Sequence, residues 1–325
     1  MAVLRTPPPH APRGELRHGE PMSRHTSWRV GGPADTWFRP ADLDDLAAFL
    51  AALDPATPVH LVGLGSNLLV RDGGVRGVVI GTHGVLSGMA RSGERGIRAE
   101  AGVPCAKIAR SCARWGLGAG EFFAGIPGTL GGALAMNAGA FGGETWDYVV
   151  AVETLDRAGV RRRRARDEYA TGYRSVQGPA GEWFIAAELA FPAGRPTTQA
   201  SIRELLVKRK ATQPIGEPSC GSVFTNPPGD HAARLIEAAG LKGCRIGGAE
   251  VSPKHANFII NTGTATAADI ERLMAHVAAE VERLHGVRLE TEVRVIGEPA
   301  TDAPGTPAAP RAAAGKIGAS GEGSS

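Results

Sequence analysis

The sequence has few cysteines, few aromatic residues and no long apolar run. Its four cysteines form no CxxC pair and no Cys/His cluster at zinc spacing, so neither a disulfide framework nor a metal site is indicated. No stretch approaches the ~18 apolar residues of a membrane span, and residues 1–21 lack the apolar core of a signal peptide. We therefore expect a cytoplasmic protein with reduced thiols and no membrane partner.

An excess of charge of one sign is also missing. Lysine and arginine total 36 and aspartate and glutamate 33, so a nucleic-acid partner is not expected, whereas small anionic ligands remain open. One local exception is the arginine run 161–164, which could be a phosphate or nucleic-acid patch. We favour a solvated hairpin, because strand alternation would split the run between two faces and no aromatic residues interleave with it.

Glycine and proline are abundant, at 45 and 23 of 325 residues, which predicts many turns and close backbone approaches. The polar, proline-rich or small-residue segments 1–18 and 298–325 cannot build a core, and we expect both to be disordered. The chain between them divides into three expected units, at 19–80, 81–205 and 206–297.

Hydrophobic periodicity predicts both helices and strands in these units. Helices are expected at 42–53, 105–115, 230–239 and 267–285, with another ending near Lys210. Strands are expected at 59–64, 183–191, 257–261 and 289–296, with a strand, turn and strand over 68–80 and a hairpin over 149–166. Strands dominate the middle and alternate with helices at both ends, which favours an α+β fold.

Two glycine-rich segments indicate ligand binding by main chain. VGLGSNLL at 62–69 starts like a dinucleotide fingerprint, but Leu68 replaces the third glycine and a strand follows, so no Rossmann helix is expected. The N–H groups of Gly65, Ser66 and Asn67 could form a nest for a diphosphate, although this motif alone fits a tight structural turn equally well.

The second segment, GIPGTLGGALAMNAGAFGG at 125–143, carries no GK[ST] and is therefore no Walker loop. Its glycines let the backbone approach a flat ring or a phosphate directly. A large planar cofactor bound by main chain is the natural inference.

Motifs along most of the chain together resemble one family, the UDP-N-acetylenolpyruvoylglucosamine reductases, also called UDP-N-acetylmuramate dehydrogenases. They are HTSWRVGGPAD (25–35), GLGSNLLV (63–70), EFFAGIPGTLGGALAMNAGAFGGE (121–144), Tyr173-Arg174, residues 209–214, SCGSVFTNP (219–227), residues 246–261 and LETEVRVIG (289–297). The resemblance implies one FAD, NADPH as reductant, and the sugar nucleotide UDP-N-acetylglucosamine enolpyruvate as substrate of a monomeric enzyme. It also implies two FAD-binding subdomains of the vanillyl-alcohol-oxidase type, at 19–80 and 81–205, and a smaller substrate domain at 206–297. The spacing resembles the family's shorter form, which lacks an inserted tyrosine-bearing loop.

The resemblance also implies site residues. Those for FAD are Gly63, Gly65, Ser66, Asn67, Leu68, Gly125, Ile126, Pro127, Gly128, Thr129, Gly131, Gly132, Asn137, Ala138 and Gly139. Those for the substrate are Tyr173, Arg174, Lys208, Arg209, Asn226 and Glu292. For Lys208 and Arg209, which lead into the third unit, an ordinary charged helix end is the alternative to a diphosphate contact.

Three residues are candidates for the chemistry. Arg174 offers a planar fork of donors that suits a carboxylate gaining negative charge, or the pyrimidine edge of a flavin. Ser222 has no hydrolase partners in sequence order, but a hydroxyl can act as a general acid, and the resemblance makes it the proton donor. The alternative for Ser222 is a polar turn that caps the helix near Asp230.

Glu292 shares a strand face with Glu290 and Arg294 if residues 289–296 alternate regularly. An exposed charge pair is the alternative. The resemblance makes Glu292 the acid that assists the enolic intermediate, although alternation alone allows Glu290. The chain departs from the family's pattern at Val176, where a serine is usual, and at Thr225, where a lysine is common; His255 has no assigned mechanism beyond a structural role.

The implied reaction has two steps: NADPH reduces FAD, and hydride from flavin N5 then adds to the enolpyruvyl group while Ser222 supplies a proton, giving UDP-N-acetylmuramate for peptidoglycan synthesis. One alternative is a flavin oxidase that passes electrons to oxygen. Another is a flavin- or nucleotide-binding module without turnover, which the presence of Ser222, Asn226 and Glu292 disfavours.

Overall fold

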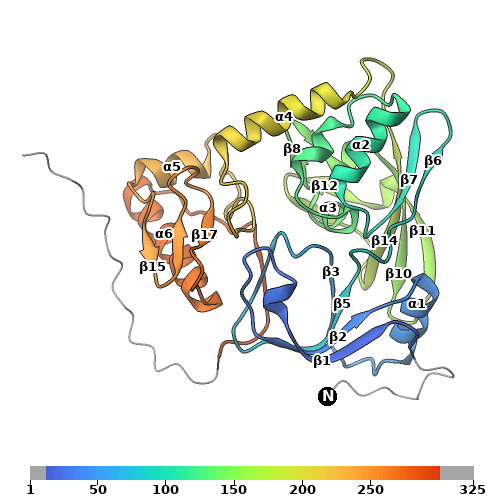
Figure 1. Cartoon of the computed structure of the whole chain (residues 1–325), viewed down its shortest axis with the longest axis horizontal. Helices are drawn as coiled ribbons and strands as arrows, with labels where there is room; N and C mark the ends of the chain where they lie inside the picture. The colour runs from blue at the N-terminus through green and yellow to red at the C-terminus, as the bar shows by residue number, and fades with distance from the viewer. Residues whose placement is uncertain (1–11, 301–325) are drawn as a thin grey trace, which may run out of the picture.

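The computed structural model describes residues 12–300 (Figure 1). Most sheets and helices of the first two thirds of the chain lie at one side of the molecule, and a smaller group of elements lies at the other, with helix α4 (Gln199–Thr212) running between them. In the part of the chain that the structure describes, no helix is both long and apolar enough to cross a membrane.

The first unit is a four-stranded sheet covered by one helix. Its strands are β1 (Glu15–Pro21), β2 (Pro33–Arg39), β3 (Val59–Val62) and β5 (Val75–Gly81), in the order β1-β2-β5-β3. Helix α1 (Leu43–Ala52) forms as predicted, because Asp42 caps its first turn by accepting from the N–H of Asp45. The expected disorder of residues 1–18 is wrong from Glu15 onward, since β1 pairs with β2 there; residues 1–11 lie outside the described part.

The strand, turn and strand over 68–80 form, but the two strands do not pair with each other. β5 lies between β2 and β3 and is parallel to both, while β4 (Leu68–Val70) pairs with β18 (Arg294–Ile296) near the end of the chain. Both strands are apolar and almost wholly buried, and such strands take partners on both sides or pack under other elements. Strand β18, the last strand within residues 12–300, therefore returns to the first unit.

The second unit is a five-stranded antiparallel sheet in the order β11-β10-β14-β7-β6. Its strands are β6 (Met89–Ser92), β7 (Gly96–Glu100), β10 (Val149–Asp156), β11 (Arg161–Ala165) and β14 (Glu182–Ala190). Helices α2 (Cys105–Trp115) and α3 (Leu130–Met136) pack with it, and α2 matches the predicted range. Short elements complete it: η2 (Glu121–Gly125), β8 (Gly139–Ala140), β9 (Gly143–Glu144), η3 (Thr145–Asp147), η4 (Arg166–Glu168), β12 (Ala170–Gly172) and β13 (Ser175–Gln177).

The predicted hairpin over 149–166 is confirmed, since β10 and β11 pair antiparallel. Its arginines alternate between the two faces and each meets a carboxylate. Arg162 bonds Asp156 and Arg164 bonds Glu182, both at 2.5 Å, while Arg163 bonds Glu188 at 2.9 Å and Arg161 bonds Asp44. The run is thus a set of ion pairs on a solvated hairpin.

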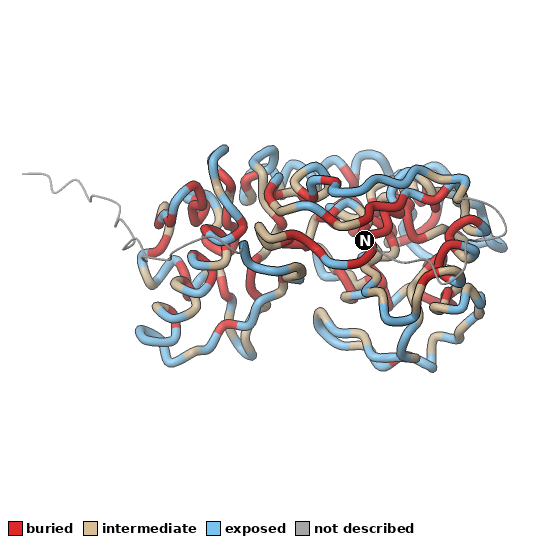
Figure 2. The backbone as a smooth tube through the Cα atoms, turned by 90° about the horizontal axis from the view of Figure 1, so that it is seen from below, coloured by how far each residue is buried: buried red, intermediate tan, exposed pale blue. Residues whose placement is uncertain are grey.

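The third unit holds α5 (Ala232–Ala238), β15 (Arg245–Ile246), β16 (Ala249–Val251), β17 (Ile259–Asn261) and α6 (Ala267–His285). Figure 2 shows its own buried interior beside the larger one. The N-terminal region contributes to that interior, because Trp28 is fully buried in it and donates its indole N–H to the carbonyl of Ile259 at 2.7 Å. The division at residues 80, 205 and 297 remains a prediction.

The expected strand over 289–296 is wrong in length. Only Arg294–Ile296 forms a regular strand, and residues before it run beside a loop instead of a strand. The N–H of Glu292 donates to the carbonyl of Val223 at 2.8 Å, and the N–H of Thr225 donates to the carbonyl of Glu290 at 2.9 Å. Because the partner is a loop, the predicted alternation breaks: Leu289 and Val293 are buried but Thr291 is exposed.

Candidate active site

A cavity of about 600 Å³ lies where the three units meet. Its wall comes from the loop between β3 and β4, the glycine-rich segment around α3, the hairpin β12–β13, the end of α4, the loop before α5 and the segment that leads into β18. Segments far apart in the sequence therefore converge on one chamber, whose size suits an organic cofactor or substrate.

Most residues expected to bind FAD line this cavity. They are Gly63, Gly65, Ser66, Asn67, Leu68, Gly125, Ile126, Pro127, Gly128, Thr129, Gly132, Ala138 and Gly139. Gly131 does not: its N–H donates to the carbonyl of Ala101 at 2.8 Å, and an added Cβ would lie 2.9 Å from the Ala101 Cβ. Gly131 therefore serves close packing of α3 against Ala101, directly after β7.

The wall is shaped for a ligand that the backbone holds closely. At Gly65 φ is +61°, and a Cβ would lie 2.0 Å from the carbonyl oxygen of His25. The N–H groups of Gly65, Ser66 and Asn67 have no acceptor within residues 12–300, so they can serve as a nest for an anion. A Cβ at Gly132, which lines the cavity, would meet nothing within 4 Å, so the wall is open at this position. These features fit FAD.

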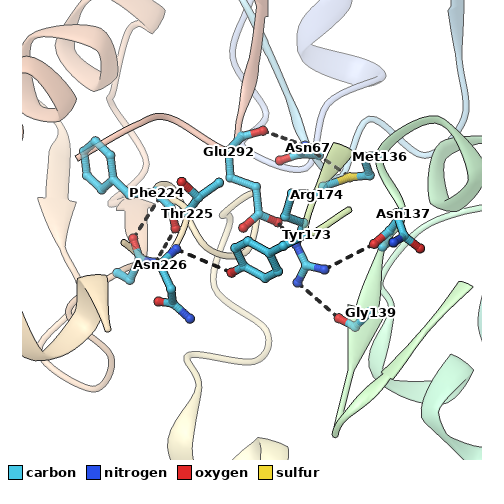
Figure 3. A network of polar contacts seen from close by, with 12 residues as sticks. Asn67, Met136, Asn137, Gly139, Tyr173, Arg174, Phe224, Thr225, Asn226 and Glu292 are labelled. Carbon is cyan, nitrogen blue, oxygen red and sulfur yellow. Dashed lines mark hydrogen bonds and ion pairs between the residues drawn. The ribbon is translucent and has the colours of Figure 1, made fainter. Parts of the chain in front are cut away.

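Arg174 and Glu292 meet at this cavity (Figure 3). Arg174 occupies the two-residue turn of hairpin β12–β13 with φ +53°, a left-handed conformation that costs a non-glycine residue about 1–3 kcal/mol and often marks a functional position. Its Nε donates to Glu292 Oε1 at 2.9 Å, and the two side chains are only 19% and 11% exposed. Burial raises the pKa of Glu292, and the Arg174 charge opposes that rise.

Glu290, the alternative to Glu292, is exposed and does not line the cavity. The backbone of Glu292 is fixed from the other side by Asn67, whose amide donates to the Glu292 carbonyl at 3.0 Å. The amide of Asn67 also lies 3.4 Å from the sulfur of Met136. Asn67, which is expected to bind FAD, thus also holds the segment that carries Glu292.

Ser222 lines the cavity directly after Gly221, whose φ is +75°. Asn257 holds the loop: its Oδ1 accepts from the N–H of Phe224 at 3.0 Å and its Nδ2 donates to the Phe224 carbonyl at 2.8 Å. Ser222 does not cap α5, because Asn226 does so by accepting from the N–H of Ala232 at 3.1 Å. Within residues 12–300 no hydrogen bond joins Ser222 to α5, so the structure does not support the capping alternative, and Ser222 lines the cavity.

Of the other expected substrate residues, only Arg209 lines the cavity. Its Nε donates to Gln213 at 2.8 Å, and burial lowers the pKa of this guanidinium. Lys208, Tyr173 and Asn226 are exposed and lie outside the lining. Tyr173 and Asn226 meet each other, since the tyrosine hydroxyl accepts from the N–H of Asn226 at 3.4 Å, and the Arg174 guanidinium lies 5.1 Å from the tyrosine ring centre.

Sequence reasoning missed several lining residues: His60, Met136, Phe141, Trp183, Gln213, Cys220, Phe258, Arg294 and Ile296. Arg294 could have been found, because it lies on the same segment as Glu292. The apolar residues gave no signal, because an apolar side chain carries no chemistry that distinguishes a cavity wall from a core. Asn257, in the motif around His255, was also missed although it fixes the Ser222 loop.

Comparison with known proteins agrees with this arrangement. Residues 34–163 match an FAD binding domain, and residues 213–296 match the C-terminal domain of UDP-N-acetylenolpyruvoylglucosamine reductase. The curated reductase of that name from Alkalilimnicola ehrlichii is 63% identical over 286 residues, covering 88% of this chain and 96% of the relative. That from Methylococcus capsulatus is 58% identical over 287 residues, covering 88% and 94%.

This chain belongs to the UDP-N-acetylenolpyruvoylglucosamine reductase family. The crystal structure of the reductase from Thermus caldophilus superposes with a TM-score of 0.71 at 33% identity, covering 87% of this chain and 99% of that one. The predicted α+β fold, with an FAD-binding part and a smaller C-terminal domain, is confirmed. As a member of this family the chain is an FAD-dependent oxidoreductase.

Proposed function

We propose that this chain reduces UDP-N-acetylglucosamine enolpyruvate to UDP-N-acetylmuramate, with NADPH as the reductant, in cytoplasmic peptidoglycan precursor synthesis. The observation that carries the proposal is the meeting of Arg174, Glu292 and Ser222 at one glycine-walled cavity. One chain supplies every lining residue, so the proposal needs only a monomer.

The backbone of the two glycine-rich segments would hold FAD, with the N–H groups of Gly65 to Asn67 available for its diphosphate. When bound, FAD would supply two-electron hydride chemistry between NADPH and the enolpyruvyl group of the sugar nucleotide. The protein's own task is then to orient the substrate, to stabilise charge and to move one proton.

Arg174 is proposed to bind the substrate carboxylate. Hydride addition to an enol ether conjugated with a carboxylate places negative charge on that carboxylate, and a fixed guanidinium at its oxygens lowers the barrier. Arg174 is suited to this task, because its side chain is four-fifths buried and held by three hydrogen-bond acceptors. In a dry site the charge acts with little screening.

Ser222 is proposed to give its hydroxyl proton to the carbon next to the carboxylate, which completes the lactyl ether. Glu292 is proposed to support the enolic carboxylate from the cavity wall, as a largely buried carboxyl beside Arg174. The hydrogen bond from the Glu292 N–H to the Val223 carbonyl keeps these two groups on adjacent segments. Solvent must replace the proton that Ser222 gives up.

Arg209 is proposed to contact the diphosphate of the sugar nucleotide. Arg209 lies in the last turn of α4, where the helix reaches the cavity. Its half-buried guanidinium donates a hydrogen bond to the neutral side chain of Gln213. Lys208 would add a weaker, exposed charge. Tyr173 and Asn226 are proposed to contact the substrate outside the cavity, where they already meet each other.

The test of this function is a balance of reactants. Under anaerobic conditions the FAD-loaded protein should consume one NADPH for each UDP-N-acetylmuramate formed, with the product measured by mass spectrometry. Rapid NADPH consumption in air without the sugar nucleotide would instead support the oxidase alternative. Tight FAD binding with no NADPH consumption under either condition would support a binding module.

A further inference from the structure

The hairpin that carries Arg174 cannot position a side chain by itself. β12 and β13 form an isolated two-stranded sheet of three residues each, and most of their residues are exposed or half-buried. A hairpin of this size is at best marginally stable in water. Arg174 also has a positive φ at the turn, which adds strain. Contacts from outside the hairpin must therefore fix the turn.

Asn137 makes the contact closest to the turn. It ends α3 with φ +47°, is 2% exposed, and donates from Nδ2 to the carbonyl of Gly172 at 3.0 Å. Its own carbonyl accepts from Arg174 Nη1 at 3.4 Å, next to the carbonyl of Gly139, which accepts from Nη2 at 3.2 Å (Figure 3). Asn137 thus contacts the hairpin at Gly172 and at Arg174, the residues on either side of Tyr173.

Every polar group of Asn137 is already engaged by the protein. Its N–H donates to Ala133 at the end of α3, and its Oδ1 accepts from the N–H of Trp146 at 3.1 Å. The second N–H of its Nδ2 donates to Glu144 Oε2 at 2.7 Å. The residue is also absent from the cavity lining. Nothing on its side chain is left for a cofactor, contrary to the expectation from sequence.

Glu144 fixes the orientation of that amide. A carboxylate only accepts, so its hydrogen bond with Asn137 determines which end of the amide is the nitrogen and turns the other N–H toward Gly172. Glu144 and Arg174 flank the same glycine: a Cβ at Gly139 would lie 3.1 Å from Glu144 Cγ and 3.4 Å from Arg174 Nη1. A chain of contacts thus runs from Glu144 through Asn137 to the guanidinium.

We propose that Asn137 and Glu144 are positioning residues for Arg174 and not ligands of FAD. The inference rests on the proposed role of Arg174. It predicts that disturbing this pair damages only the step in which the substrate carboxylate is bound and reduced. Uptake of FAD and its reduction by NADPH should be spared.

Asn137→Asp is the sharpest variant, because aspartate keeps the size and tolerates the left-handed backbone but replaces both N–H donors by an acceptor facing Glu144 and Gly172. We expect normal FAD content, a normal rate of reduction by NADPH, and roughly a tenfold to hundredfold loss in the rate at which the sugar nucleotide reoxidises the reduced protein. Hydrogen exchange should rise in residues 170–177 and stay unchanged in the β10–β11 hairpin.

Two Glu144 variants keep the test independent of one substitution. Glu144→Gln retains an oxygen that can accept from Asn137 and should keep most of the activity, while Glu144→Ala should resemble Asn137→Asp. A cycle with Arg174→Lys completes the design: since Asn137 acts through Arg174, the double variant should be little worse than Arg174→Lys alone.

The outcomes separate cleanly. Lost FAD content or slowed reduction by NADPH in Asn137→Asp would make Asn137 a cofactor ligand and overturn the inference. Wild-type behaviour of Asn137→Asp together with a damaged Arg174→Lys, or strictly additive losses in the double variant, would overturn the inference and leave the proposed function standing. Wild-type behaviour of Arg174→Lys and Arg174→Ala would overturn both.

Discussion

Arg174 Nε lies 2.9 Å from Glu292 Oε1, although 118 residues separate the two in the sequence. The pair joins a hairpin of the second unit to the segment that leads back to β4 in the first. An ion pair this buried stabilises little by itself, because desolvation offsets most of the attraction. Its position at a cavity wall is better explained by catalysis than by stability.

Replacing Arg174 should therefore affect reaction with the sugar nucleotide most. Arg174→Lys keeps a charge but loses the planar fork, and Arg174→Ala also leaves Glu292 buried without a partner. We expect kcat/KM for the sugar nucleotide to fall roughly a hundredfold or more in the alanine variant and less in the lysine variant. Arg161→Lys, on the exposed hairpin, is the matched control and should change neither half-reaction. A loss confined to reduction by NADPH would contradict the assignment.

The pKa of Glu292 predicts how stability depends on pH. Because burial raises this pKa in the folded chain, the folded state binds the proton more tightly than the unfolded state does. That stabilisation is complete below the ordinary glutamate pKa and is lost as the pH rises through the raised value. Glutamine at position 292 cannot ionise. The melting temperature of Glu292→Gln minus that of the parent should therefore be larger at about pH 8 than at about pH 4. Equal differences at both pH values would show that Glu292 is not held in a desolvated site.

Gly132 offers a test of the cavity as the FAD site. A Cβ added at Gly132 would have open space around it, and Gly132 lines the cavity, so we expect Gly132→Leu to fold and to fill space that FAD needs. Removing glycine from a helix interior gains up to about 1 kcal/mol, so the FAD-free chain should melt no lower than the parent. The FAD content after purification should be lower in Gly132→Leu than in the parent, and that of Gly132→Ala should lie between them. Full FAD content in the leucine variant would place the cofactor elsewhere.

Ser222→Ala tests the source of the proton. Removing the donor should slow reoxidation of the reduced protein by the sugar nucleotide by roughly a hundredfold or more, while reduction by NADPH is unchanged. Ser219→Ala is a matched control, because Ser219 lies in the same loop and outside the cavity lining. If a single turnover of Ser222→Ala discharges the reduced protein into product at the parent rate, another group supplies the proton.

Local sequence patterns were sufficient for the parts of the fold that local interactions determine. The helices at 105–115 and 267–285 form over the predicted ranges, because their periodic apolar faces and end residues act within a few turns. The glycine-rich segments indicated a main-chain binding site, and their residues form most of the cavity wall. The order of the motifs then identified the family.

Strand pairing could not be predicted in the same way. β4 and β5 follow one another through a short turn, yet β4 pairs with β18, because the choice of partner is decided by burial in the assembled fold. The same limit applies to Asn137. The resemblance implied a cofactor contact for this residue, and no local pattern could show that its side chain bonds Gly172, Glu144 and Trp146 in the folded chain.

The visible spectrum of the purified protein tests the central claim most directly. We predict a yellow protein whose flavin absorbance is lost when NADPH is added without oxygen and returns when UDP-N-acetylglucosamine enolpyruvate follows. A colourless protein that cannot take up FAD, or a reduced flavin that the sugar nucleotide leaves unchanged, would contradict the account.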